Sequence, residues 1–167
     1  MFGLTSLGII HTAISLVAVA AGLIALVRDR QITSGNRLGQ VYFITTALTA
    51  LTGFGIFQHG GFGKPHALGL LTLVVLCIIV VASRTQLYGR WSKITEVVGY
   101  SATFLFHMIP GITETTTRLP LGAPLLPNAE APELQVAGAV LGLLFLIGAA
   151  LQARRLWPTA PAAVAAT

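Results

Sequence analysis

Five long apolar segments alternate with short polar connections along the chain. A helix needs roughly 20 mainly apolar residues to cross the hydrocarbon core of a bilayer, and each segment approaches that length. Short connections favour antiparallel neighbours within one bundle. The pattern therefore predicts an all-α membrane protein with a single domain over about residues 1–155 and a flexible tail at 156–167. The predicted transmembrane helices span about residues 4–27, 38–57, 66–82, 94–112 and 134–151.

Composition supports the membrane class and excludes several functions. The chain is 54% hydrophobic and only 9% charged, and its mean hydropathy is +0.82. The first segment is predicted to be a retained helix, because no basic residue precedes it and its apolar core is too long for a signal peptide. A glycine-rich phosphate loop, a nucleophile elbow and an HExxH motif are all missing from the sequence. Nucleotide use, serine hydrolysis and zinc proteolysis therefore have no visible basis.

The basic residues predict the orientation of the helices. With five spans, eight of the ten lysines and arginines fall on one side. The positive-inside rule then places the N-terminus outside and the C-terminus in the cytoplasm, in a bacterial inner membrane. The net charge of +5 is interpreted as this topological signal, so no nucleic-acid partner is expected. The lipid bilayer is the expected partner.

A polar line runs along the fourth predicted helix. Its members recur at steps of four, three, four and seven residues and share a sector of about 60° on one helical face. They are Glu96, Tyr100, Thr103, His107 and Glu114. Ionisable side chains are costly in a bilayer, so this face is expected to point at protein or water. Glu96, Tyr100 and Thr103 form the predicted polar seam.

The four histidines gather toward the outer side in this topology. His11 and His107 are each expected roughly 10 Å below the outer boundary, at six to seven residues of about 1.5 Å each. His59 and His66 lie in or beside an outer hairpin, and Glu114 ends the fourth helix. Two facing imidazoles can ligate haem b, whereas a set of imidazoles with a carboxylate can hold a divalent transition metal. A proton path through Glu96, Tyr100, His107 and Glu114, or simple hydrogen bonding between helices, remains open.

Small and hydroxyl-bearing residues predict how the helices pack. Gly22 belongs to a face of small and polar residues, and Gly138 and Gly142 have the small-xxx-small spacing of close helix contacts. A stripe of threonines on the second helix is interpreted as packing, because threonine hydroxyls bond their own backbone; it comprises Thr45, Thr49 and Thr52. Tyr42 and Tyr100, together with Trp91 and Trp157, are interpreted as interface anchors, and Pro110 is expected to kink or end the fourth helix.

Several short motifs lie in the first half of the chain: Ile10-His11, Gly22, the Asn36-to-Tyr42 entry to the second helix and His66-Ala67-Leu68-Gly69. Through these motifs, about residues 7–83 resemble a group of small polytopic bacterial membrane proteins of unknown function. Members usually carry a histidine where this chain has Asn36. The group is distantly similar to four-helix b-type cytochromes, and this similarity implies haem binding.

The sequence thus leads to two hypotheses. The first is an outer pocket that binds haem b or a transition metal through His11 and His107, with His66, His59 and Glu114 as supporting ligands, and that exchanges electrons with a quinone or another redox partner. The second is a non-catalytic accessory subunit, or a component of a proton-coupled transporter that forms a homo-oligomer through Gly138 and Gly142.

Overall fold

A computed structural model describes residues 5–56, 61–85 and 87–157. This part of the chain contains five α-helices and one short 3₁₀ helix, and no strand lies within it, so the predicted all-α class is confirmed. His59 and nearly all of the predicted tail lie outside the described residues. The helices are α1 (Ser6–Asp29), α2 (Arg37–Gly53), α3 (Lys64–Arg84), η1 (Gly89–Trp91), α4 (Ser92–Arg118) and α5 (Pro132–Leu156).

Local capping chemistry sets where the first helices begin. The Thr5 hydroxyl accepts from the Gly8 N–H at 3.1 Å, and the Asn36 side chain accepts from the Gly39 N–H at 2.8 Å. Each bond satisfies a backbone donor that has no partner inside its own helix. Asn36, at the position where the resembling group usually carries a histidine, thus serves as the N-cap of α2.

The expected end of the fourth helix at about residue 112 is wrong. α4 continues through Pro110 to Arg118. Proline removes one backbone hydrogen bond, yet ending the helix there would leave several more backbone groups without partners in a lipid environment. The Thr113 hydroxyl also bonds the Ile109 carbonyl across this turn, at 2.9 Å.

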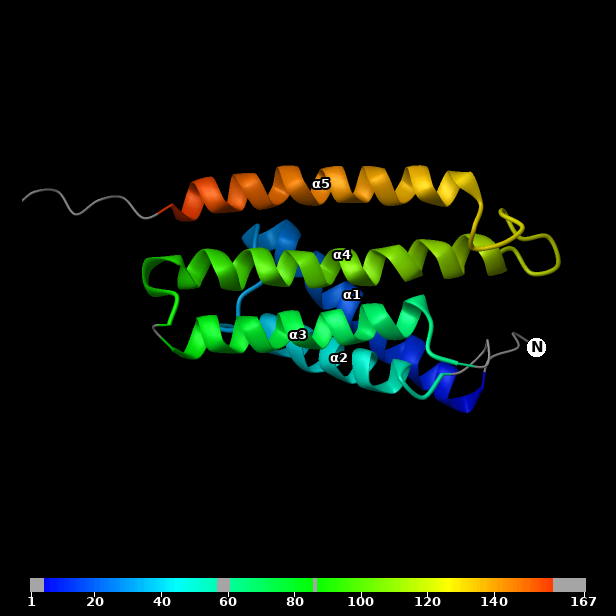
Figure 1. Ribbon diagram of the computed structural model, residues 1–167, viewed down its shortest axis with the longest axis horizontal. Helices are drawn as coiled ribbons and strands as arrows, with labels where there is room; N and C mark the ends of the chain where they lie inside the picture. Colours follow the sequence, from blue (N-terminus) through cyan, green and yellow to red (C-terminus); the bar gives the residue numbers. More distant parts are fainter. Residues whose placement is uncertain (1–4, 57–60, 86, 158–167) are drawn as a thin grey trace, which may run out of the picture.

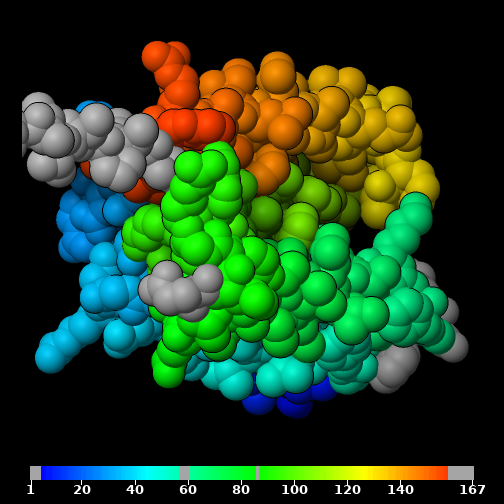
Figure 2. Space-filling view, turned by 60° about the vertical axis from the view of Figure 1, so that its left-hand side comes forward, coloured from blue at the N-terminus to red at the C-terminus, as the bar shows by residue number. Residues whose placement is uncertain are grey.

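Helix α4 occupies the middle of the bundle. It lies between α3 and α5, α2 lies beside α3, and α1 crosses behind them (Figure 1). The main helix contacts are α1 with α2, α3 with α4, α4 with α5, and α2 with α3. In Figure 2, α5 in yellow and orange forms one side of the molecule, away from the cyan surface of α2. No residue of α5 is buried, so α5 covers one flank of α4 and leaves its own outer face open.

Within the described residues, three helices are long and apolar enough to cross a membrane: α1, α3 and α5. The coarse prediction of an integral membrane protein agrees with this finding. The other two helices differ from these for separate reasons. α2 has only 17 residues, whereas α4 has 27 residues but carries the polar line.

The tyrosines do not serve as interface anchors. Tyr42 and Tyr100 are 0% and 1% exposed and are among the largest fully buried side chains. Burial of a tyrosine in an apolar core requires a partner for its hydroxyl, and both hydroxyls have one. The anchor interpretation is therefore wrong for these two residues. It suits Trp91 and Trp157 better, since both are exposed and their rings meet edge to face at 4.8 Å.

Candidate functional site: a buried polar seam

The polar line of α4 faces the interior of the bundle. Glu96, Tyr100, Thr103 and His107 are all buried, with at most 8% of each residue exposed. Glu114 departs from this arrangement, because its side chain is 56% exposed and pairs with Arg118 on the next turn. The interior seam therefore ends at His107. Glu114 contributes through long-range charge at most.

One end of the seam fixes the connection between α1 and α2. The Ser34 backbone N–H donates to Glu96 Oε1 at 2.7 Å, and Ser34 Oγ lies 2.9 Å from the Tyr100 hydroxyl. Lys93, one turn before Glu96, donates to Oε2 of the same carboxylate at 2.9 Å. A buried carboxylate is costly unless it is paired and hydrogen-bonded. Here both oxygens of Glu96 have a partner.

The middle of the seam joins α4 to α2. The hydroxyls of Tyr42 and Thr103 are 2.9 Å apart, and Thr103 donates to the Tyr100 carbonyl at 2.9 Å. The rings of Tyr42 and Tyr100 meet edge to face, with centroids 5.8 Å apart. These contacts link the lower part of the seam to its upper part through aromatic packing.

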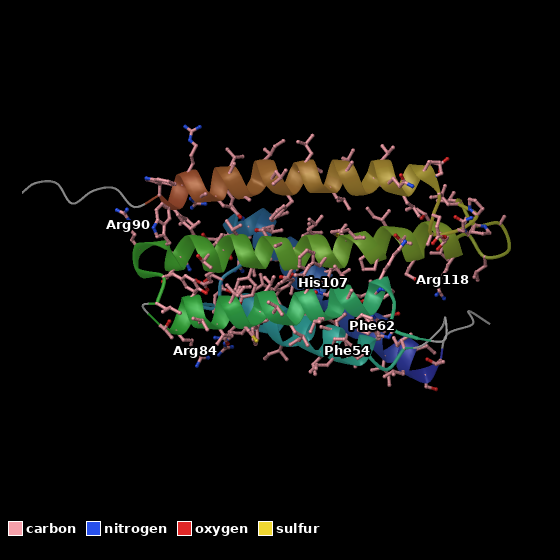
Figure 3. The ribbon with its side chains drawn as sticks, in the orientation of Figure 1. Phe54, Phe62, Arg84, Arg90, His107 and Arg118 are labelled. Carbon is pink, nitrogen blue, oxygen red and sulfur yellow. The ribbon has the colours of Figure 1, made fainter. Side chains whose placement is uncertain are left out.

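His107 occupies the upper end of the seam. Its Nε2 lies 3.1 Å from the Thr46 hydroxyl of α2, and its ring meets Tyr42 edge to face at 6.1 Å. Thr46 is one turn after Tyr42 and lies beside the Tyr42 hydroxyl. Figure 3 places His107 near the middle of the bundle, between the end with Arg84 and Arg90 and the end with Arg118.

His11 contacts a different level of α2. Its Nδ1 lies 3.0 Å from the Thr52 hydroxyl, and a Cβ added to Gly53 would lie 3.4 Å from its Cε1. Thr52 is six residues beyond Thr46, which corresponds to about 9 Å along a helix. The sequence predicted a common depth for His11 and His107, whereas their threonine partners lie nearly two turns apart.

His66 has a local structural role at the start of α3. It is buried, and its Nδ1 accepts from the Gly63 backbone N–H at 3.2 Å. The rings of Phe62 and Phe54 lie 5.4 and 6.4 Å from it, centroid to centroid. Both phenylalanines lie toward the Arg118 end of the bundle in Figure 3. The imidazole thus helps to cap α3 within an aromatic contact.

The predicted metal ligands are not gathered into one group in the described part of the chain. A shared iron or metal ion requires two imidazole nitrogens about 4 Å apart. Among the described residues, no group of three or more His, Cys, Asp or Glu side chains is placed to hold a metal ion. His11, His107 and His66 instead bond to three separate polar groups, and Glu114 pairs with Arg118. The role of these residues as haem or metal ligands stays a prediction.

The predicted packing glycines have different surroundings. Gly22 is buried where α1 meets α2 and α4, and an added Cβ would lie 2.7 Å from Phe104 and 2.8 Å from Tyr42. Added Cβ atoms on Gly138 and Gly142 would have no neighbour within 4 Å. Gly22 thus permits close helix approach within one chain, and homo-oligomer formation through the other two stays a prediction.

Sequence reasoning missed the partners of the seam. Ser34 was assigned no role, and Tyr42 was assigned to the interface. Thr46 lies outside the predicted threonine stripe, whose members donate to their own helix, at the carbonyls of Val41, Thr45 and Leu48. The spacing of Tyr42, Thr46 and Thr49 by four and three residues could have indicated this inward face.

Known proteins were compared with the chain by sequence family, by sequence and by structure. No protein-family model matches the chain, and no curated protein and no solved structure matches it either.

Proposed function

We propose that the protein is a five-span integral membrane protein that relays protons along its buried seam, as a component of a proton-coupled transporter. In this proposal α2 and α4 also cross the membrane, in addition to α1, α3 and α5. The N-terminus lies outside, and the basic end of the bundle lies in the cytoplasm. The observation that supports it is the row of polar contacts, buried or partly buried, that follows one face of α4 from Glu96 to His107. Buried ionisable groups within membrane helices commonly mark proton or ion pathways.

The hydroxyl groups of the upper seam have a preferred direction. Thr103 gives its single hydroxyl proton to the Tyr100 carbonyl, so Tyr42 donates to Thr103. The Tyr42 oxygen can then accept a hydrogen bond from Thr46, which lies one turn further along α2. Thr46 in turn accepts from His107 Nε2–H. In this arrangement Nδ1 of His107 carries a lone pair that can take up a proton.

The lower seam supplies a second group that can hold a proton. Glu96 bonds the Ser34 backbone, and the Ser34 hydroxyl bonds the Tyr100 hydroxyl. The Ser34 backbone N–H does not relay a proton. In this proposal the Glu96 carboxylate therefore turns to the Ser34 hydroxyl, and the serine and tyrosine hydroxyls, which both donate and accept, pass the proton toward the imidazole. Rotation of the Thr103 hydroxyl away from the Tyr100 carbonyl is the step that joins the upper and lower parts in this proposal.

Proton flux into liposomes tests the proposal. Purified protein is reconstituted with a pH-sensitive dye inside, and a pH gradient is imposed with potassium and valinomycin to balance charge. We expect the pH gradient to dissipate faster than in protein-free liposomes. In His107→Phe and Thr46→Val, the rate of dissipation is expected to fall to that of protein-free liposomes. Thr45→Val is the matched control, because the Thr45 hydroxyl bonds its own helix at Val41. Wild-type flux equal to that of protein-free liposomes would refute the relay.

A further inference from the structure

A second site lies outside the seam, on the flank where α5 meets α4. A groove of about 270 Å³ runs between these helices, with Leu26 of α1 also lining it. Its other lining residues are almost all apolar and include Phe104, Met108 and Phe145. Because α5 has no buried residue, this groove opens toward the surroundings of the bundle.

Ser101 and Gln152 line one end of the groove, and their polar atoms are bonded within the protein. The Ser101 hydroxyl donates to Gln152 Oε1 at 2.9 Å, and Gln152 Nε2 donates to the Arg30 carbonyl at 3.2 Å. The polar atoms at this end are thus already bonded to each other. The interior of the groove offers apolar contact, as a hydrocarbon chain requires.

Unpaired cationic side chains lie just beyond that end. Positions 141, 145, 148, 152 and 155 follow steps of four, three, four and three, so Arg155 continues the α5 face that lines the groove. Arg30 follows α1 directly, and both arginines are exposed. The ion pairs found in the described part of the chain involve Arg28, Lys93 and Arg118, and neither of these two arginines.

We infer that the groove is a binding site for one anionic phospholipid. One acyl chain lies between α4 and α5, and the phosphate is bound by Arg30 and Arg155. Charge complementarity is the reason for choosing this occupant, since basic pockets between membrane helices bind anionic lipid head groups. Arg90 stacks over Trp91 at 5.4 Å at the same end of the bundle (Figure 3), as expected at a head-group level.

Glycine at position 148 makes a direct test possible. Gly148 lines the groove, and an added Cβ would meet nothing within 4 Å. Gly148→Leu therefore places its Cβ without a clash and extends a side chain into the groove, and leucine favours the helix more than glycine does. Ala150→Leu is the matched control, because Ala150 is exposed and lies outside the groove lining.

Native mass spectrometry in detergent provides the measurement. The protein is incubated with equal amounts of dioleoyl phosphatidylglycerol and dioleoyl phosphatidylcholine. We expect one phosphatidylglycerol to be retained preferentially, to be lost in Gly148→Leu and to be kept in Ala150→Leu. The double variant Arg30→Gln/Arg155→Gln is expected to bind both lipids equally. Equal retention of both lipids by the wild type, or unchanged retention in Gly148→Leu, would overturn the inference.

Discussion

Ser34 and Glu96 lie 62 residues apart in the sequence and are joined by a 2.7 Å hydrogen bond from the serine backbone to the carboxylate. The bond attaches the connection between the first two helices to the start of α4. Lys93, also on the first turns of α4, shares the same carboxylate, so one buried side chain joins two segments and binds a cation as well. The stability of this end of the bundle should depend on the negative charge of Glu96.

Glu96→Gln is expected to destabilise the folded protein. The substitution keeps the shape of the side chain but removes the charge that strengthens its bonds to Ser34 and Lys93. Hydrogen bonds to charged groups contribute about 1.5–3 kcal/mol each, so a loss of about 1–3 kcal/mol in the free energy of unfolding is expected. Thermal unfolding in detergent measures it. Asp29→Asn is the control, since its ion pair with Arg28 is on the surface, and it should change stability little.

The bond between His107 and Thr46 can be isolated by a double-mutant cycle. Thr46→Val leaves a buried imidazole nitrogen without its hydroxyl partner and is expected to cost about 1–3 kcal/mol. Adding His107→Phe removes the other polar group, so the double variant should be less destabilised than the sum of the single variants. Strict additivity in unfolding experiments would show that the two side chains are not coupled.

Gly22→Ala tests the close approach of α1 to its neighbours. Its Cβ would lie within 3 Å of Phe104 and Tyr42, and overpacking of a core typically costs about 1–3 kcal/mol. Gly142→Ala places the same methyl group where nothing lies within 4 Å. It should gain up to about 1 kcal/mol from helix propensity. Equal effects of the two substitutions on the melting temperature would contradict the packing at Gly22.

The haem hypothesis has its own test. Because His11 and His107 bond to threonines nearly two turns apart on α2, we expect the purified protein to show no b-type absorption spectrum after reduction. The measurement requires only a visible spectrum and elemental analysis of protein purified from cells supplied with haem precursor. A reduced b-type spectrum that disappears in His107→Ala would restore the cofactor hypothesis and displace the proton relay.

Homo-oligomer formation is tested at α5. The outer face of this helix is open, and Gly138 and Gly142 have space beside them. If these glycines form the contact between two copies, Gly142→Ile should convert a dimer to a monomer, since small residues allow membrane helices to approach closely. Single-molecule photobleaching in liposomes counts the copies. A stable dimer of Gly142→Ile would place the contact elsewhere.

Periodicity predicted the inward face of α4 well, and the positions of the helices closely. Glu96, Tyr100, Thr103 and His107 are buried together, because ionisable groups spaced at helical steps have to face protein in an apolar chain. The partners of these groups were harder to predict. Which threonine of α2 reaches His107, Thr46 rather than Thr49, depends on the rotation of α2 about its axis, and the hydropathy of a short helix defines that rotation poorly.

The depth of His11 and His107 in the membrane stays a prediction. Counting residues from the outer end places both at one level, and such counting assumes parallel helices that end in one plane. α1 crosses behind the other helices (Figure 1), and α4 continues through Pro110 to Arg118, so residue counts alone do not define depth.

The seam and α5 belong to separate parts of the molecule. Every bond of the seam lies within residues 34–107, whereas α5 packs on one flank of α4, bonds through Gln152 and forms one wall of the groove. No seam residue lies on the last helix. Substitutions on the outer face of α5 can therefore change what the protein recognises in its surroundings while the interior chemistry stays intact.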